Sequence, residues 1–278
     1  MPSINNSKCV LVTGATSGIG RALAEAISKL PSQPEVIGAG RRPDRLKELE
    51  NIGIHPAHLE LDTDANSLKK AVKDIAQKFP DADDEGHQLD TIILNAGIQR
   101  IHNFLESDEA DLEKLHKEMN INYHSILTVI TSILPHFKKL AAAGRPCMIV
   151  TVTSVLGVVP AQHVPNYSAS KAALHSLTLS LQSQFQGTNI HFIEILPPNP
   201  TVSLVESELH DADGTTEKLS KQWMPLDEFI PATMEGLKKG EPHIGPGVSG
   251  IAFGRYEKEK YQLVMQKETM GSVPESWK

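Results

Sequence analysis

The sequence predicts an α/β fold with a doubly wound, mostly parallel seven-stranded sheet that carries helices on both faces. Short apolar runs alternate along the chain with longer segments of helical periodicity, the order expected when crossover helices join parallel strands. Several of these runs contain almost no charged residue, such as CVLVT at 9–13 and TIIL at 91–94. Strands of this kind are buried on both faces, which favours a parallel sheet over an antiparallel one.

The apolar runs predict seven strands, and the sequence signal for the last strand is weak. These strands are expected at residues 8–13, 35–39, 55–61, 91–94, 147–153, 190–196 and 242–244. Helices are expected where apolar residues recur on one helical face, as Leu23, Ala24 and Ile27 do. The predicted helices cover residues 19–29, 44–50, 65–79, 108–142, 166–186 and 226–239.

The whole chain, 1–278, is expected to form one domain, because this length is common for an undivided α/β core. Residues 197–225 differ from the rest in being rich in proline, acidic residues and serine. We interpret this segment as an excursion that forms a substrate loop, and not as a linker between domains.

Charge and hydropathy argue against nucleic-acid and membrane partners. The chain has 27 Lys and Arg against 34 Asp and Glu, a formal charge of −7, whereas a surface that binds the phosphate backbone is usually basic. There is no apolar run of about 18 residues for a membrane span and no signal-peptide pattern at the start, so the expected location is the cytoplasm. The 12 histidines show no metal-ligand grouping with cysteine or acidic residues, and no metal is expected.

A glycine-rich turn directly after the first predicted strand indicates a dinucleotide site. Residues 13–20 read TGATSGIG and lead into the first predicted helix. Glycine permits the tight turn and lets the backbone approach a pyrophosphate, while the helix N-terminus offers free N–H groups to that anion. The expected cofactor contacts are Gly14, Thr16, Ser17, Gly18, Ile19 and Gly20. The alternative is a turn that needs glycine for its shape alone.

The leading Thr13 and the Gly-x3-Gly-x-Gly spacing of this turn resemble the short-chain dehydrogenase/reductase family, whose members have a Rossmann fold. Further motifs follow in the order of that family and cover most of the chain: Asn95-Ala96-Gly97, Ser154, and Tyr167-x3-Lys171. The resemblance implies that Asn95 ties strands together while the backbone of Ala96 and Gly97 passes close to the cofactor. It also implies that Asp62 hydrogen-bonds the adenine. Within the family, the chain looks like a little-characterised subgroup.

Two arginines at the end of the second predicted strand favour NADP(H) over NAD(H). In the family, an acidic residue here would bind the ribose 2′-hydroxyl and repel a 2′-phosphate. This chain has Gly40-Arg41-Arg42 instead, and guanidinium groups pair well with phosphate. Arg41 is the expected contact. The alternative is that both arginines belong to a solvated turn.

Ser154, Tyr167 and Lys171 are the expected catalytic residues. Tyr167 and Lys171 are separated by one helical turn and so share a face. A tyrosine hydroxyl with a pKa of about 10 is a poor base at neutral pH, and a neighbouring ammonium group lowers that pKa. Ser154 ends a predicted strand, where doubly wound folds bind ligands. The resemblance implies that Ser154 binds the substrate carbonyl, that Tyr167 exchanges the proton, and that Lys171 also contacts the nicotinamide ribose.

The same resemblance implies a fourth catalytic residue, an asparagine that holds a water molecule in a proton relay. Asn122 is the expected residue because the family usually has an apolar residue before this asparagine, and here Ile121 precedes it. Asn120 is the alternative.

The loop after the sixth predicted strand departs from the family pattern. Pro197-Pro198 stands where Pro-Gly is usual, and proline excludes the positive φ that glycine allows, so the loop must take another path. Thr201 is still expected to contact the carboxamide of the cofactor. This departure is the argument for an alternative function, a non-catalytic NADP(H)-binding sensor or scaffold protein.

Together these features predict an NADP(H)-dependent oxidoreductase that transfers a hydride between the nicotinamide and a carbonyl or alcohol substrate. Substrate choice is expected to depend on mostly apolar residues, namely 155–160, His163, Leu204, Trp223 and Met224. They suit a moderately apolar carbonyl compound; the alternative is that they only hold the excursion against the body. The resemblance implies a homo-oligomer, a dimer or tetramer, formed through the helices that carry Ile126, Leu174, Leu177 and Leu181.

Overall fold

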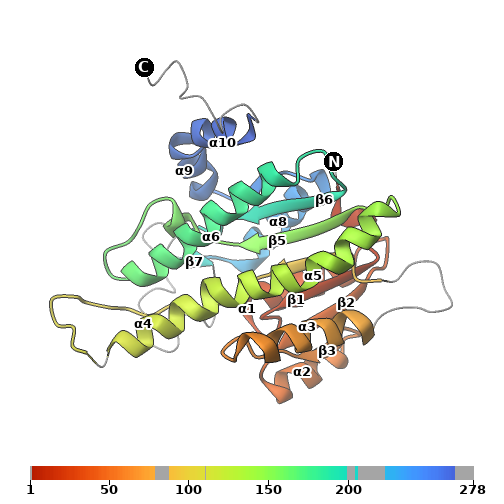
Figure 1. Cartoon of the computed structure of the whole chain (residues 1–278), viewed down its shortest axis with the longest axis horizontal. Coiled ribbons are helices and arrows are strands. Elements are labelled where there is room, and N and C mark those ends of the chain that lie inside the picture. The colour runs from red at the N-terminus through yellow and green to blue at the C-terminus, as the bar shows by residue number, and fades with distance from the viewer. Residues whose placement is uncertain (1, 79–87, 110, 199–203, 206–222, 267–278) are drawn as a thin grey trace.

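Seven parallel strands form one sheet in the order β3-β2-β1-β4-β5-β6-β9 (Figure 1). The structure is a computed structural model that describes residues 2–78, 88–109, 111–198, 204–205 and 223–266. The strands are β1 Cys9–Thr13, β2 Glu35–Gly40, β3 His55–His58, β4 Thr91–Leu94, β5 Cys147–Val152, β6 Ile190–Ile195 and β9 His243–Ile244. The doubly wound α/β fold predicted from the sequence is confirmed, including its weak last strand.

Helices cover both faces of the sheet, and the sheet separates two apolar cores (Figure 1). One face carries α1 Gly18–Ser28, α2 Pro43–Glu50 and α8 Leu226–Lys239. The other face carries α3 Ala65–Lys78, α5 Ser125–Ala142 and α6 Pro165–Gln184. Every residue of β1, β4 and β5 is buried, which explains why these strands lack the polar alternation of a half-exposed sheet.

The helix predicted at 108–142 is not continuous, and this part of the prediction is wrong. The chain forms α4 Asp111–Met119, then a π-helical turn η2 at Asn120–His124, and then α5. A π turn inserts an extra residue into a helix and is common at functional sites. The apolar spacing is close to helical on both sides of the turn, so the sequence pattern alone does not reveal the interruption.

Two C-terminal helices were not predicted, α9 Val248–Tyr256 and α10 Lys258–Met265. Of their residues, α9 buries only Ser249 and α10 buries none, so neither has the apolar face that marks a helix in a sequence. They lie beside α6 at the edge of the molecule (Figure 1).

Smaller differences concern element ends and the excursion. The predicted strand 55–61 ends at His58, and the helix predicted at 166–186 begins at Pro165 and ends at Gln184. Within the predicted excursion, β7 Leu204–Val205 pairs with β8 Trp223–Met224 in parallel. The remainder of the excursion after Pro198 lies outside the described residues, apart from Pro225.

Ile126 and Leu174 are buried in the core on the sheet, and Leu177 and Leu181 pack against that core. Their packing on the sheet is thus observed directly.

Every helix in the described part of the chain is too short or too polar to span a lipid bilayer.

Leu11 provides a test of the central strand. Its side chain is 0% exposed in the core between β1 and the helices on the α5 face. Leu11→Ala is expected to lower the free energy of unfolding by about 3 kcal/mol, because it removes buried methyl groups and leaves a cavity. Urea unfolding measures this loss. Ile52→Ala, at a side chain that is 47% exposed, is the control and should cost less than about 1 kcal/mol. Equal losses for the two variants would contradict the proposed core.

Candidate active site

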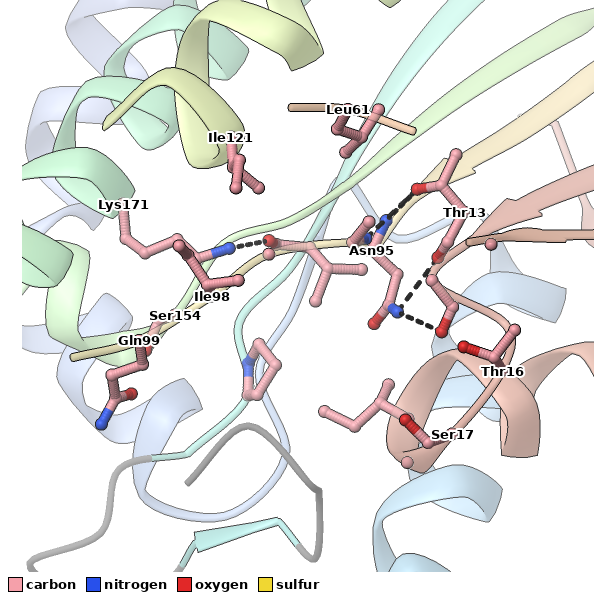
Figure 2. Close-up of a pocket in the computed structure, with 18 of the residues that line it drawn as sticks. Thr13, Thr16, Ser17, Leu61, Asn95, Ile98, Gln99, Ile121, Ser154 and Lys171 are labelled. Atoms are coloured by element: carbon pink, nitrogen blue, oxygen red, sulfur yellow. Dashed lines mark hydrogen bonds between the residues drawn. The ribbon is translucent and has the colours of Figure 1, made fainter. Parts of the chain in front are cut away.

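A cavity of about 370 Å³ opens at the carboxyl ends of the central strands (Figure 2). Its size is within the range of small-molecule sites. The predicted site residues that line it are Gly14, Thr16, Ser17, Gly18, Ile19, Arg41, Asn95, Ala96, Gly97, Ser154, Tyr167 and Lys171. Three others, Gly20, Asp62 and Asn122, lie behind or beside this lining, and Thr201 lies outside the described residues. The fold therefore gathers most of the predicted residues into one cavity.

The glycine-rich turn lies directly against the segment that follows β4. Gly14 has a φ of +68°, a conformation that L side chains rarely adopt. A Cβ atom at Gly20 would lie 2.4 Å from Asn95 Nδ2 and 2.4 Å from the Gly14 carbonyl oxygen, so only glycine fits there. As a result, the amino end of α1, at Gly18 and Ile19, forms part of the cavity wall.

Asn95 joins the ends of β1 and β4. Its side-chain Nδ2 donates to the carbonyl oxygen of Thr13 at 3.1 Å and to that of Gly14 at 3.4 Å. The Thr13 hydroxyl accepts hydrogen bonds from the backbone N–H groups of Asn95 and Ala96 at 3.0 and 3.2 Å (Figure 2). Asn95 thus joins the two strand ends, the role that the family resemblance implies for it.

Arg42 reaches the glycine-rich turn, whereas Arg41 is the residue that the sequence analysis names as the contact for the 2′-phosphate. The Arg42 guanidinium donates to Thr16 Oγ1 at 3.0 Å and to Ser17 Oγ at 2.7 Å. Arg41 also lines the cavity but is exposed to solvent. A fixed guanidinium beside two hydroxyl groups and a helix N-terminus makes a strong anion site. The sequence indicated the pair but not which member turns inward.

Asp62 contacts a lysine and is not part of the cavity lining. Its Oδ2 atom lies 2.5 Å from Nζ of Lys117 on α4. The preceding residues Leu59, Glu60 and Leu61 line this end of the cavity instead.

Ser154 and Tyr167 lie together at the other end of the cavity. The Ser154 Oγ atom accepts a hydrogen bond from the backbone N–H of Leu156 at 3.1 Å, capping the short helix η3 Val155–Gly157. Tyr167 is buried, and this burial raises its pKa, although the neighbouring Ser154 hydroxyl acts in the opposite direction. The sequence led us to expect a pKa of Tyr167 lowered by Lys171, but desolvation outweighs the effect of the Ser154 hydroxyl, and the charge of Glu118 raises the pKa further.

Lys171 is buried on α6 one turn after Tyr167. Its Nζ atom donates to the carbonyl oxygen of Val152 at 2.9 Å and lies 5.6 Å from the centroid of the Tyr167 ring. Burial lowers the pKa of Lys171 to about 8, and the charge of the buried Glu118 opposes this shift. The ammonium group therefore lies between the end of β5 and the Tyr167 ring.

Asn122 comes from the π turn and is fully buried. Its Oδ1 accepts from the backbone N–H of Ile98 at 2.9 Å, and its Nδ2 donates to the Ile98 carbonyl at 2.8 Å and to Ser170 Oγ at 3.0 Å. A Cβ atom at Gly97 would be 3.1 Å from Asn122 Oδ1 and 3.6 Å from Lys171 Nζ. Asn122 and Lys171 therefore flank the same glycine.

Some cavity residues were not predicted. Gln99 is buried and lines the cavity near Ser154, as Figure 2 shows, and Ile98 and Pro198 also line it. Leu156, which belongs to the predicted substrate residues 155–160, lines the cavity as well. The position of Gln99 two residues after the Asn95-Ala96-Gly97 turn is the signal that could have identified it. His163 lies outside this lining, where its carbonyl oxygen accepts from the His102 backbone N–H.

Comparison with known proteins identifies one family. A family model described as short chain dehydrogenase matches residues 8–213. The chain is 31% identical to the uncharacterized oxidoreductase DltE of Bacillus subtilis over 88% of this chain and 89% of that protein.

Solved structures share the fold. A short-chain dehydrogenase from Sphingobium yanoikuyae in complex with NADPH superposes with a TM-score of 0.75 at 20% identity, covering 99% of each chain. A short chain dehydrogenase/reductase from Burkholderia phymatum in complex with NAD has a TM-score of 0.73 at 17% identity, covering 96% of this chain and 99% of that one. Proteins with this fold thus bind either cofactor.

The lowered pKa of Lys171 predicts a specific pH dependence of stability. Burial lowers this pKa from the usual 10.5 to about 8, so between these values the unfolded state holds more protons than the folded state. Stability contributed by Lys171 therefore rises with pH across this window. The free energy of unfolding of the wild type, relative to Lys171→Met, should increase by about 2 kcal/mol from pH 8 to 10.5.

Urea unfolding at several pH values measures this difference. The control is Lys70→Met, which replaces an exposed lysine on α3 and should show a difference from the wild type that changes little with pH. A wild-type advantage over Lys171→Met that stays constant with pH would refute the lowered pKa.

Proposed function

The chain belongs to the short-chain dehydrogenase family and is an NAD(P)-dependent oxidoreductase, and from this premise we propose that it is an NADP(H)-dependent enzyme for small carbonyl or alcohol substrates. The observation that carries the proposal is the meeting of Ser154, Tyr167 and Lys171 with the glycine-rich turn in one cavity. A proton donor suits protonation of a carbonyl oxygen during hydride transfer, a cation stabilises the charge left on that donor, and an anion-binding helix end suits the pyrophosphate of a dinucleotide.

The residues on the cofactor side fit a dinucleotide. The amino end of α1 and the close-packed turn at Gly14 provide N–H groups for the pyrophosphate. The Arg42 guanidinium, held by Thr16 and Ser17, fits the 2′-phosphate that distinguishes NADP(H) from NAD(H). When bound, the cofactor supplies the hydride for reduction or accepts it in oxidation.

Ser154 and Tyr167 are suited to act on the substrate oxygen. Because Ser154 Oγ accepts from the Leu156 N–H, its own hydroxyl proton is available to donate to a carbonyl oxygen. The raised pKa keeps Tyr167 protonated at neutral pH, and a protonated phenol can donate its proton to that oxygen during reduction.

Lys171 on α6 and Asn122 in the π turn η2 support Tyr167. A protonated Lys171 would stabilise the negative charge that Tyr167 acquires as it gives up its proton. The family resemblance implies that the same lysine would hold the ribose of a bound cofactor. Asn122 lies next to Lys171 across Gly97, a position that suits a water-mediated return of the proton. Homo-oligomer formation remains an expectation that rests on the family resemblance.

Tyr167→Phe is expected to reduce kcat by about a hundredfold or more, because it removes the proton donor and leaves the ring in place. The measurement is NADPH oxidation, followed by absorbance, with a panel of aldehydes, ketones and quinones. Tyr256→Phe is the control, since the Tyr256 side chain is 57% exposed on α9. Full turnover by Tyr167→Phe would exclude the assigned role. Binding of NADPH by the wild type without oxidation on any substrate would favour the sensor or scaffold function.

Arg42→Ala is expected to raise KM for NADPH by about tenfold or more while leaving KM for NADH almost unchanged, because only NADPH carries the 2′-phosphate. Arg41→Ala is the matched control and should have the smaller effect, since Arg41 makes no contact with Thr16 or Ser17 comparable to that of Arg42. Steady-state kinetics with both cofactors measures this. A larger effect from Arg41→Ala would assign the phosphate to Arg41, and equal effects on both cofactors would contradict 2′-phosphate recognition.

A further inference from the structure

A buried polar cluster lies under α6, next to the proposed active site but not used by it. On the face of the sheet that α6 covers, β5 and β6 begin with apolar residues such as Ile149 and Phe192. Toward the carboxyl ends the same face carries Thr151, Thr153 and Glu194. Glu194 is 0% exposed, and a buried carboxylate is unfavourable unless it is paired and hydrogen-bonded.

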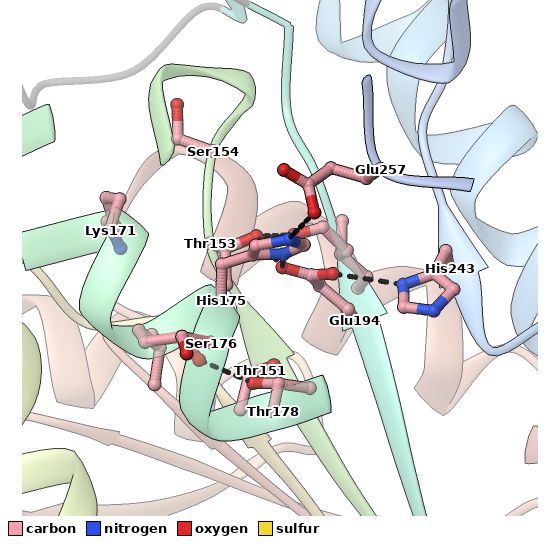
Figure 3. Close-up of polar contacts among 12 residues, drawn as sticks. Thr151, Thr153, Ser154, Lys171, His175, Ser176, Thr178, Glu194, His243 and Glu257 are labelled. Carbon is pink, nitrogen blue, oxygen red and sulfur yellow. Dashed lines mark hydrogen bonds and ion pairs between the residues drawn. The ribbon is translucent and has the colours of Figure 1, made fainter. Parts of the chain in front are cut away.

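Glu194 is held by three side chains, which Figure 3 shows. Its Oε1 atom accepts from the Thr153 hydroxyl at 2.6 Å and lies 2.7 Å from Nδ1 of His175 on α6. Its Oε2 atom lies 3.0 Å from Nδ1 of His243 on β9. Burial alone would raise the pKa of Glu194, but the hydrogen bonds from the two histidines outweigh it and lower the pKa.

His175 is placed between two carboxylates. Its Nε2 atom lies 3.1 Å from Oε2 of Glu257, close enough for an ion pair although the geometry is not that of an aligned hydrogen bond. Burial alone would lower the pKa of His175, but Glu194 and then Glu257 outweigh it and raise the pKa. Lys260 on α10 also pairs with Glu257 at 2.7 Å. The cluster therefore connects α6, β5, β6, β9 and the C-terminal helices through charged groups.

The cluster is attached to the same two segments that carry the proposed catalytic residues. Thr153 directly precedes Ser154 at the end of β5, and His175 follows Lys171 by one turn of α6, so the two share a face. On the cavity side, Lys171 Nζ bonds the Val152 carbonyl. The strand end and the helix are therefore joined twice, once through Lys171 in the site and once through Glu194 behind it.

Stability alone does not explain such a cluster. Replacing a buried ion pair with apolar residues of similar size is often neutral or stabilising, so charges buried here are weak evidence for a role in stability. Nor does metal binding explain it: among the described residues, no group of three or more His, Cys, Asp or Glu side chains could hold a metal ion. Charged hydrogen bonds do, however, fix the distance and orientation of the elements that they join.

We propose that Glu194 and His175 are positioning residues that set the placement of Ser154 relative to Tyr167 and Lys171, and that Glu257 couples the C-terminal helices α9 and α10 to this placement. The proposal rests on the proposed function, because it concerns the geometry of the same site. Glu194 acts through Thr153 on the strand end, and His175 acts on α6. Misplacement of reacting groups by about 1 Å can reduce turnover by about a hundredfold, so small shifts of either segment matter.

Glu194→Gln tests the proposal, because it removes the charge but keeps the shape of the side chain. We expect kcat to fall by about tenfold or more, with KM for NADPH within about twofold of the wild-type value. The matched control is Glu235→Gln, which removes an exposed carboxylate that pairs with Lys239 on α8 and should leave kcat unchanged. Unchanged kcat in Glu194→Gln would overturn the proposal.

Glu257→Gln keeps the proposal falsifiable if Glu194→Gln does not fold. It removes the second carboxylate of His175 at the edge of the cluster, and we expect a loss of kcat of about threefold at unchanged KM for NADPH. Full activity of a folded Glu257→Gln variant would contradict the proposed coupling of α9 and α10 to the active site. If the Glu257→Gln variant were fully active and the Glu194→Gln variant did not fold, the cluster would have a structural role only, and the whole proposal would be overturned.

A crystallographic measurement separates this proposal from the proposed function. If none of the carbonyl compounds supports NADPH oxidation by the wild type, the proposed function fails. The positions of the site residues can still be compared in crystal structures. In that case the distance between Ser154 Oγ and Lys171 Nζ in Glu194→Gln should differ from the wild-type distance by about 1 Å. Identical positions of these atoms in the two crystal structures would overturn the positioning role.

Discussion

The side chain of Asn95 links the carboxyl ends of β1 and β4, and the rest of the site is built around that link. Its amide nitrogen donates to the carbonyl oxygens of Thr13 and Gly14. This contact brings the glycine-rich turn against the backbone that leads to Gly97. Because Gly20 has no Cβ atom, α1 can begin close to that backbone, and its amino end becomes a wall of the cavity.

The site combines groups that a stable core would normally avoid. Lys171 is buried with a pKa lowered to about 8, and Tyr167 is buried with a raised pKa. Both shifts come mainly from desolvation, which disfavours the charged form of each group. A protein optimised for stability alone would place apolar residues here, so the observed pair is better explained by chemistry at the cavity. The same reasoning applies to the buried cluster of Glu194 and His175 behind the cavity.

Local sequence patterns predicted the sheet and most helices, and together with the family resemblance they predicted most of the site residues that meet in the cavity. The reason is that short-range rules govern them: β1 is apolar throughout, the glycine-rich turn follows it directly, and Tyr167 and Lys171 are one helical turn apart. The missed features depend on contacts between distant segments. Neither the inward turn of Arg42 nor the pairing of Glu194 with His175 can be read from neighbouring residues, and α10 buries no side chain that would mark it.

The central claim is hydride transfer from NADPH to a carbonyl carbon at the cavity formed by Ser154, Tyr167 and Lys171. The most direct measurement uses NADPH that carries deuterium at either C4 position and follows the label by mass spectrometry after incubation with aldehydes and ketones. We expect deuterium on the carbinol carbon of an alcohol product, delivered from one of the two C4 positions. Saturable NADPH binding with no labelled alcohol from any compound would contradict the claim.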